Sequence, residues 1–414
     1  MLFLYRVIIN LIFIISPFII IFRLFKKKED IIRFKEKFCI HSKKRFKGKL
    51  IWFHGASVGE ILSVIPLIEK LEKNKKISQI LITSNTLSSS KIFSSLKLRK
   101  TTHQFFPIDT NYHSKKFLDY WKPSSVIFID SEIWPNMIIN IKKKPISLIL
   151  LNGRISNNSF RKWKKIILNA KILFKKFDIC LPSDAQSGKY FKRLGIKKIK
   201  YIGNLKFSQT ETTEYQLNEV LKKYISLKKI WCAASTHETE EKLCAEVHKK
   251  LKTKYKNLLT IIIPRHVERT NEIEDEIRRL DLKIHRHSSL KKVNDNTDIY
   301  LVDSYGKTKP FFKICKTVFL GGSIIRHGGQ NPLEAARYGC KVLYGRNIWN
   351  FKEIYTLLNH HNVADKVNNL NQLADNIDKI FMSKNNSQNI KNKINNLGNK
   401  ILNSTLKEIN SFII

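Results

Sequence analysis

Short apolar runs alternate with longer amphipathic segments along most of this chain. The runs are rich in Ile, Leu, Val and Phe, which is typical of strands that are buried on both faces of a parallel sheet. They occupy residues 50–53, 80–83, 126–129, 147–151, 179–181, 230–233, 259–263, 299–302, 318–320 and 342–344. Helical patterns fall between most of these runs, and this order predicts βαβ units. The sequence therefore predicts an α/β fold built from doubly wound parallel sheets.

The same pattern divides the chain into segments. A chain of 414 residues exceeds one typical hydrophobic core, so we expect two domains. We place their junction where residues 208–228 become polar and show no strand pattern. The predicted segments are an anchor at 1–25, a basic connector at 26–48, Rossmann-like domains at 49–210 and 211–390, and a terminal helix at 391–414.

The first 25 residues are the most apolar part of the chain. Sixteen residues lie between Arg6 and Arg23, nearly all of them apolar, and Pro17 interrupts the pattern. This length is slightly short for a full membrane span. No small-residue cleavage site follows, and the lysines at 26–28 favour keeping the rest of the chain on the cytoplasmic side. We expect a retained anchor that either spans the membrane or lies in its interface.

The net charge of the chain is large, but it does not identify the class of partner that the protein binds. The 76 basic and 34 acidic residues give a net charge of +42, which favours anionic lipid, nucleic acid or a phosphorylated glycolipid. A general compositional bias explains the charge equally well, because the lysines are spread along the chain. The six cysteines form no C-x-x-C pair, which argues against a disulfide framework or a zinc site.

A glycine-rich stretch at residues 317–354 is the longest motif with a chemical meaning. It contains a buried strand, a loop and a short helix, for which Asn331 is the expected N-cap and Pro332 the first residue. Glu334 stands three residues after the cap, and Gly339 suits the helix end. Such a loop presents backbone N–H groups to a phosphate. An ordinary strand–loop–helix turn is the alternative.

Carboxylates follow two of the predicted strands. Ser57 and Glu60 have the capping-box spacing, so Glu60 either caps its own helix or acts as a general base at the carboxyl end of the strand. Asp130 and Glu132 follow the strand at 126–129 and could bind a metal. No histidine or third carboxylate is spaced to complete such a site, so we expect no metal.

Three further features have both a structural and a chemical interpretation. Ser235 and Glu238 again have the capping-box spacing, which predicts a helix start directly after the strand at 230–233. Arg265 follows another strand and is either a surface residue or a bidentate phosphate ligand. Lys206 is either solvated or directed toward the ligand, where it would stabilise departing negative charge.

Taken together, these motifs resemble those of the Kdo transferases, which move 3-deoxy-D-manno-octulosonic acid (Kdo) from CMP-Kdo to lipid A precursors. The matching segments occur in the order of that family: SVGE at 57–60, SEIWPN at 131–136, NGRIS at 152–156, GNLKF at 203–207, ASTHETEE at 234–241, PRHVER at 264–269, DSYGK at 303–307 and GGQNPLE at 328–334. Two positions depart from the family pattern, since Lys307 replaces a glutamate and Gln330 replaces a histidine.

This resemblance implies a GT-B glycosyltransferase with two domains facing across a cleft, and an inverting transfer that uses no metal and no cofactor. It implies that Glu60 is the general base, that Glu132 assists the transition state and that Lys206 stabilises departing charge. It places Glu334 at the ribose hydroxyls, and Tyr305 and Gly306 as backbone contacts. The implied nucleotide-binding residues are Pro264, Arg265, Tyr305, Gly306, Lys307, Asn331, Pro332, Leu333 and Glu334.

The resemblance also implies the partners and the location. The donor is expected to be CMP-Kdo, and the acceptor a tetra-acyl, bisphosphorylated lipid A precursor at the anionic surface of the inner (cytoplasmic) membrane. The catalytic domains are expected on the cytoplasmic face, and no nucleic acid is expected. One alternative is another GT-B enzyme that uses a UDP-sugar and a lipid acceptor. The other is a non-enzymatic, basic protein that binds membranes or polyanions.

Overall fold

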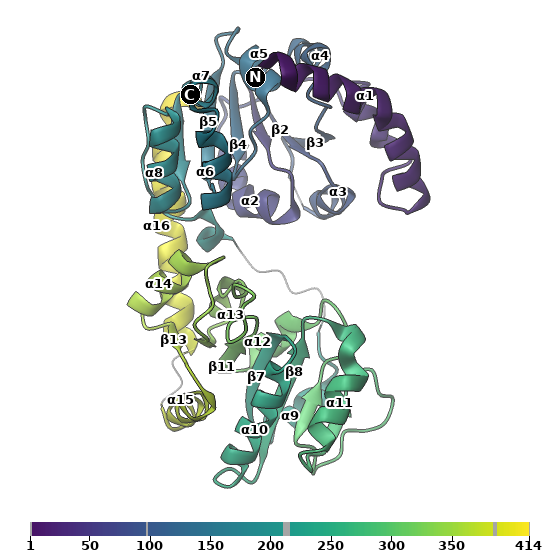
Figure 1. Cartoon of the computed structure of the whole chain (residues 1–414), viewed down its shortest axis with the longest axis vertical. Helices are drawn as coiled ribbons and strands as arrows, with labels where there is room; N and C mark the ends of the chain where they lie inside the picture. Colours follow the sequence, from purple (N-terminus) through teal and green to yellow (C-terminus); the bar gives the residue numbers. More distant parts are fainter. Residues whose placement is uncertain (1, 97, 210–215, 384–386, 414) are drawn as a thin grey trace. The chain divides into compact units, whose positions relative to one another are not determined.

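Two parallel β-sheets organise the chain in the computed structural model (Figure 1). The structure describes residues 2–96, 98–209, 216–383 and 387–413. The chain divides into two compact units, of which unit 1 is Met1–Thr210 with Leu397–Ile414 and unit 2 is Glu211–Asn396. The predicted boundary at residue 210 falls within residues 210–215, outside the described residues. The last helix, α16 (Ser387–Ile413), begins in unit 2 and ends in unit 1.

Unit 1 contains a six-stranded sheet in the order β3-β2-β1-β4-β5-β6. Its strands are β1 (Leu50–His54), β2 (Gln79–Ser84), β3 (Thr101–Phe105), β4 (Ser125–Ile129), β5 (Ser147–Gly153) and β6 (Ile179–Pro182). All pairings are parallel, with Trp52 opposite Leu81 on one side and Val126 on the other. The order reverses between β1 and β4, and open α/β sheets hold their ligands beyond the carboxyl ends of strands at such a point.

The helices of unit 1 lie between these strands and after the last of them. They are α2 (Val58–Glu72), α3 (Leu87–Ser94), α4 (Asn111–Trp121), α5 (Pro135–Ile141), α6 (Asn157–Lys164), α7 (Ile167–Phe174), α8 (Ala185–Leu194) and the short 3₁₀ helix η2 (Leu205–Ser208). Every residue of β1, β4 and β6 is buried, and Trp52, Phe117, Trp121 and Phe128 are among the largest side chains of the core. Burial on both faces explains why these strands are continuous apolar runs.

Unit 2 repeats this architecture with seven strands in the order β13-β12-β11-β7-β8-β10-β9. Its strands are β7 (Lys229–Thr236), β8 (Leu258–Pro264), β9 (Ile284–Arg286), β10 (Ile299–Leu301), β11 (Thr317–Leu320), β12 (Lys341–Tyr344) and β13 (Ala364–Lys366). Its helices are α9 (Glu219–Ser226), α10 (Glu240–Lys252), η3 (Val267–Arg269), α11 (Thr270–Arg278), α12 (Thr308–Ile314), α13 (Leu333–Arg337), α14 (Lys352–His360) and α15 (Leu370–Met382). Here the order reverses between β7 and β11.

The predicted α/β class with doubly wound parallel sheets is confirmed, and each predicted strand corresponds to an observed one. Three observed strands, β3, β9 and β13, are absent from the prediction. All three lie at the edges of their sheets, and their sequences are TTHQF, IHR and ADK. Each of these three strands pairs with one neighbour and contains partly exposed residues, so it does not need a continuous apolar run.

The N-terminal helix α1 (Leu2–Phe25) belongs to unit 1. It is long and apolar enough to cross a membrane, judged by length and composition. One stripe of the helix packs against unit 1, since Ile9, Ser16 and Ile20 are buried and the Phe13 ring lies 4.8 Å from that of His113. Most of its other apolar side chains are exposed, including Phe3 (81%).

The basic connector after α1 is more ordered than its composition suggests. It contains the 3₁₀ helix η1 (Arg33–Phe38) and packs beside the edge strand β3. The buried Glu36 carboxylate accepts from Arg33 Nε at 3.0 Å and from the backbone N–H of Phe105 at 2.8 Å. This carboxylate therefore satisfies an N–H group at the carboxyl end of the edge strand.

Candidate active site

The carboxyl end of β1 holds the first candidate residue, Glu60. The Ser57 side chain caps α2 by accepting from the Glu60 N–H, as its capping-box spacing predicts. The Glu60 carboxylate accepts from the Ala56 N–H at 2.7 Å and from the Ser57 hydroxyl at 2.9 Å. Glu60 is half-buried, so capping its own helix and facing solvent are compatible at this position.

The surroundings of Glu60 make it a stronger base than an ordinary glutamate. Its pKa is raised mainly by burial, and the negative charges of Glu132 and Asp130 add to that effect. The hydrogen bonds from Ser57 and Ala56 act in the opposite direction and fix the orientation of the carboxylate. A raised pKa and a fixed orientation are what a general base requires.

Glu132, beyond the neighbouring strand β4, has a different environment. Its Oε2 atom accepts from Trp134 Nε1 at 2.8 Å and lies 3.0 Å from His54 Nε2. Burial acts to raise the pKa of Glu132, but the interactions with His54 and Trp134 outweigh it and lower the pKa. Glu132 therefore remains charged beside Glu60.

His54 was not identified from the sequence, although it ends the strand that precedes Glu60. Its ring is fully buried and stacks on Phe106 with the ring centroids 3.9 Å apart. Nδ1 lies 2.9 Å from the Thr83 hydroxyl, which also accepts from Trp52 Nε1 at 2.8 Å. Nδ1 also lies 3.2 Å from the Thr83 carbonyl oxygen, so both ring nitrogens face oxygen atoms and the ring is fixed between Thr83 and Glu132.

The remaining candidates of unit 1 gather at the same edge of the sheet. Asp130 has a left-handed backbone (φ 60°), and its Oδ2 atom lies 4.0 Å from Lys206 Nζ. Burial raises the pKa of Asp130, and Lys206 and Arg154 lower it. Asn152 (φ 54°) accepts from the Leu205 N–H at 3.0 Å, which ties the end of β5 to the turn that carries Lys206. Strained positions of this kind concentrate at functional sites.

At the corresponding edge of unit 2, a carboxylate makes a different set of hydrogen bonds. The buried Glu240 carboxylate accepts from four backbone N–H groups, those of His237, Gly322, Ser323 and Ile324. The expectation that this part of the glycine-rich loop offers its N–H groups to a phosphate is therefore wrong, because a side chain of unit 2 already occupies them.

The close approach of β7 and β11 explains the glycine at the start of this loop. A Cβ atom on Gly321 would lie 2.4 Å from the Ser235 carbonyl oxygen and 2.7 Å from Glu240 Oε2. The predicted capping box of Ser235 and Glu238 is also wrong. Strand β7 continues to Thr236 through an irregularity at the left-handed Ser235 (φ 53°). Helix α10 begins only at Glu240, after the left-handed Thr239 (φ 74°).

The predicted nucleotide-binding residues of unit 2 follow β8, β10 and β11, of which β8 and β10 are neighbours and β11 is separated from β8 by β7. Pro264 ends β8 and Arg265 is exposed directly after it. Tyr305, in the loop after β10, donates its hydroxyl to Glu268 at 2.9 Å, so the loops after β8 and β10 are in contact. Gly306 has φ 76°, and Lys307 is the N-cap of α12.

The loop after β11 leads to the last group of predicted residues. Helix α13 starts at Leu333 after Pro332, one position later than predicted. Asn331 is exposed, and its side chain accepts from the Leu333 N–H at 3.2 Å, so it still acts as a capping group. Glu334 is half-buried in the first turn. The backbone oxygen of Gln330 accepts from the Tyr355 hydroxyl. Because this bond uses the backbone, the replacement of a histidine by Gln330 does not affect it.

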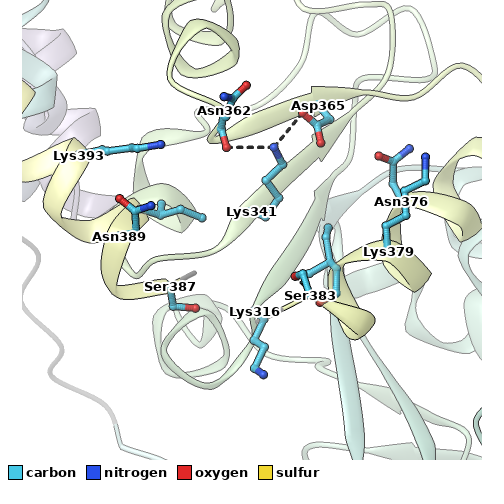
Figure 2. A pocket seen from close by; sticks show the side chains of 12 residues that line it. Lys316, Lys341, Asn362, Asp365, Asn376, Lys379, Ser383, Ser387, Asn389 and Lys393 are labelled. Carbon is cyan, nitrogen blue, oxygen red and sulfur yellow. Dashed lines mark hydrogen bonds and ion pairs between the residues drawn. The ribbon is translucent and has the colours of Figure 1, made fainter. Parts of the chain in front are cut away.

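A cavity of about 410 Å³ lies at the opposite edge of the unit 2 sheet (Figure 2). It is lined at the amino ends of β11 and β12 by Lys316 and Lys341, and Lys341 Nζ donates to Asp365 Oδ1 and the Asn362 carbonyl oxygen. The predicted site residues lie at the other ends of the strands, so this cavity belongs to a separate surface. Within the described ranges, no cluster of three or more His, Cys, Asp or Glu side chains is arranged to hold a metal.

Comparisons of the sequence with known proteins identify its family. Residues 32–209 match the family described as 3-Deoxy-D-manno-octulosonic-acid transferase (kdotransferase). A 3-deoxy-D-manno-octulosonic acid transferase of Rickettsia bellii is 34% identical over 387 residues, which cover 92% of this chain and 91% of that protein. One from Haemophilus influenzae is 31% identical over 317 residues, which cover 74% of this chain and 73% of that protein.

Solved structures show the same fold. A putative UDP-N-acetylglucosamine 2-epimerase from Listeria monocytogenes is 12% identical, with a TM-score of 0.59, over 88% of this chain and 97% of that one. At this identity the similarity concerns the fold alone. Together with the two doubly wound sheets, it confirms the predicted GT-B class.

Proposed function

This chain belongs to the 3-deoxy-D-manno-octulosonic acid (Kdo) transferase family, glycosyltransferases of lipopolysaccharide biosynthesis, and we propose that it moves Kdo from CMP-Kdo to a lipid A precursor with Glu60 as the general base. The acceptor in this proposal is the tetra-acyl, bisphosphorylated disaccharide. The observation that supports it most directly is the position of Glu60 at the switch point of unit 1, half-buried, with its pKa raised and two hydrogen bonds orienting it.

The proposed step is a single inverting displacement. Glu60 takes the proton of an acceptor hydroxyl, and the oxygen attacks the anomeric carbon of Kdo. The new glycosidic bond forms as the bond from that carbon to the phosphate oxygen breaks, and CMP leaves with the electron pair. Glu132 keeps its negative charge beside Glu60, which makes Glu60 more basic. Its charge also favours the oxocarbenium character that develops on the sugar.

Unit 2 is proposed to hold the cytidylate. Because Glu240 occupies the N–H groups of Gly322, Ser323 and Ile324, the phosphate depends on side chains instead. The exposed Arg265 offers a bidentate donor at the carboxyl end of β8. Asn331 and Glu334 follow β11 on the same edge, and we assign Glu334 to the ribose hydroxyls. Tyr305, Gly306 and Lys307 complete this set from the loop after β10.

The leaving phosphate is proposed to be stabilised by protein cations without a metal or cofactor. Lys206, on the unit 1 edge, and Arg265 are the groups assigned to this task. A positive protein also suits the ligands, since the donor carboxylate, the donor phosphate and the acceptor phosphates are all anionic, and the net charge of the chain is +42.

The membrane contact is proposed to be interfacial rather than spanning. Helix α1 lies against unit 1 along its length, since Tyr5 donates to Asp109 near its start and Ile9, Ser16 and Ile20 are buried. A helix held along the domain in this way can lie parallel to the membrane surface, with its exposed apolar side chains inserted into one leaflet. We propose the cytoplasmic leaflet of the inner membrane, where the basic connector meets anionic lipid.

A transfer assay tests the proposal. The full-length protein is incubated with CMP-Kdo and the tetra-acyl acceptor, and the product mass is measured, with UDP-sugars as competing donors in parallel. We expect Kdo addition from CMP-Kdo, and we expect Glu60→Gln to lower kcat by about 10²- to 10⁴-fold.

Glu69→Gln is the matched control, because Glu69 is exposed on the same helix α2 and should leave kcat unchanged. Near-normal transfer by Glu60→Gln would refute the role of the base. Transfer from a UDP-sugar alone would refute the donor. Acceptor binding that weakens steeply with salt, without any product, would indicate a binding protein instead.

A further inference from the structure

Helix α5 of unit 1 begins without a local capping group. Its N-cap residue is Trp134, whose side chain makes no capping hydrogen bond, and Pro135 has no N–H to satisfy. The next two N–H groups belong to Asn136 and Met137, which are buried. Buried helix N-termini need acceptors from elsewhere in the protein.

Asp109, from the loop between β3 and α4, supplies both acceptors. Its Oδ2 atom accepts from the Asn136 N–H at 3.0 Å, and its Oδ1 atom accepts from the Met137 N–H at 2.8 Å. The Asn136 side chain returns a hydrogen bond to the Asp109 carbonyl oxygen at 2.7 Å. Asp109 is fully buried, so the start of α5 is fixed by a residue 27 positions earlier in the chain.

The first turns of α1 bind the same pair of residues. The Tyr5 hydroxyl donates to Asp109 Oδ2 at 2.8 Å, and Arg6 Nε donates to Asn136 Oδ1 at 3.0 Å. Arg6 Nη2 also lies 3.4 Å from Asn111 Oδ1. The N-terminal helix therefore contacts the capping device of α5 with two polar side chains, in addition to its apolar packing.

Trp134, the residue directly before α5, contacts residues of the candidate active site. Trp134 Nε1 donates to Glu132 Oε2 at 2.8 Å, and the Trp134 ring packs 5.1 Å from that of Phe106 and 6.3 Å from that of His54. A shift at the start of α5 moves Trp134 and with it one of the two donors that hold Glu132 ionised.

We propose that Asp109 is a positioning residue for Kdo transfer, which connects the first turns of α1 through the start of α5 to the Glu132 carboxylate. This inference rests on the proposed function, since the role of Glu132 belongs to it. In this arrangement α1 is a structural part of the active site as well as a membrane contact. A different apolar helix of equal length would keep the membrane contact and lose the link.

The titration of Asp109 agrees with this assignment. Burial raises the pKa of Asp109 to about 7, while the hydrogen bonds from Tyr5, Asn136 and Met137 lower it. Loss of the Tyr5 hydroxyl therefore raises the pKa further, and more of the carboxyl is protonated at neutral pH. A protonated carboxyl keeps one oxygen as a donor and accepts less well from the two backbone N–H groups.

Tyr5→Phe and Asp109→Asn, singly and together, test the link. Tyr5→Phe keeps the apolar ring and the Asp109 side chain, so it preserves packing and only weakens the acceptor of the two backbone N–H groups. In Asp109→Asn the amide nitrogen faces either one of the two backbone N–H groups, and that group loses its acceptor. We expect kcat to fall about threefold in Tyr5→Phe and about tenfold in Asp109→Asn, with an unchanged KM for CMP-Kdo.

Coupling between the two residues is the decisive readout. If α1 acts through Asp109, the double variant has the kcat of Asp109→Asn alone, whereas independent effects would multiply. Amide hydrogen exchange at Asn136 and Met137 should accelerate in Tyr5→Phe, and binding to anionic vesicles should not change. Tyr112→Phe is the matched control, since Tyr112 lies exposed on α4.

Unchanged kcat in both single variants, multiplying effects in the double variant, or unchanged exchange at Asn136 and Met137 would each overturn the inference. If Asp109→Asn does not fold, Tyr5→Phe and its exchange rates decide the question. If the wild-type protein transfers no Kdo, the proposed function fails, and the exchange measurement still establishes whether α1 fixes the start of α5.

Discussion

Both units have a glutamate at the same point of the same topology, and the two carboxylates differ in exposure and in hydrogen bonding. Glu60 is in the first turn of the helix after β1, and Glu240 begins the helix after β7. Both strands adjoin the reversal of strand order in their sheets. Glu60 is half-buried and accepts from one backbone N–H and one hydroxyl, whereas Glu240 is buried and accepts from four backbone N–H groups.

This difference leaves the two carboxylates with different capacities to accept further hydrogen bonds. A carboxylate with four N–H donors has its acceptor sites filled and stabilises a loop. A carboxylate with two donors and an exposed side keeps acceptor capacity for a substrate hydroxyl. The experiments below test this distinction, beginning with the largest expected effect.

Replacing Glu240, whose carboxylate accepts four hydrogen bonds, should lower the stability of the protein. In Glu240→Gln the amide nitrogen faces two of the four N–H groups, and each of these loses its acceptor, at about 1–3 kcal/mol per buried group. We expect the free energy of unfolding to fall by about 2–6 kcal/mol. Denaturant unfolding measures this change, and amide hydrogen exchange at Gly322, Ser323 and Ile324 shows whether the loss is local to the loop.

Glu238→Gln is the matched control, because Glu238 is exposed two residues earlier and should change stability by less than about 0.5 kcal/mol. Glu60→Gln should likewise leave stability nearly unchanged while it abolishes most of the transfer. If Glu240→Gln were as stable as the wild type and lost transfer instead, the contrast between the two glutamates would disappear.

Removing the charge of Glu132 should change both the rate and its pH dependence. The negative charge of Glu132 raises the pKa of Glu60, so in Glu132→Gln that pKa falls. A base must be deprotonated to act, so the acid limb of kcat against pH should move to lower pH. The rate at its plateau should fall about tenfold, because a weaker base accepts the proton less readily.

The pH profile of kcat from pH 4 to 9 measures this shift, with Asp119→Asn, an exposed carboxylate on α4, as the control. A limb that moved to higher pH, or did not move at all, would contradict the electrostatic coupling of Glu132 to Glu60.

Removing the Ser57 hydroxyl should have the smallest effect and the opposite sign. Its hydrogen bond to Glu60 lowers the pKa of that carboxyl, so in Ser57→Ala the pKa rises and the acid limb moves to higher pH. Loss of the N-cap should also cost about 1 kcal/mol of stability.

Thr86→Ala provides the comparison for this variant. The Thr86 side chain caps α3 in the same way, by accepting from the Ser89 N–H. It should lose similar stability and leave the acid limb in place. If both variants shifted the limb equally, the shift would reflect general destabilisation of unit 1 rather than the bond to Glu60.

Much of the fold could be predicted from the sequence, because central parallel strands are buried on both faces and must be apolar throughout. The edge strands β3, β9 and β13 were not predicted, because they are only partly buried and lack a continuous apolar run. Residues such as Thr101 and His285 take their extended form from pairing with the neighbouring strand, which no local pattern records. The polar residues at strand ends could be identified because they directly follow apolar runs or stand at recognisable spacings in the loops after them.

Of the candidate site, the sequence by itself determined which residue types stand at the strand ends, including Glu60, Glu132 and Arg265. The tertiary structure alone decided what each one touches. His54 faces Glu132 across 78 positions of sequence, and Asp109 caps α5 from another loop. The capping spacing of Ser57 with Glu60 and of Ser235 with Glu238 is the same, yet one box forms and the other does not. Spacing describes neighbours along the chain, whereas burial and hydrogen-bond partners depend on strand order, which long-range packing sets.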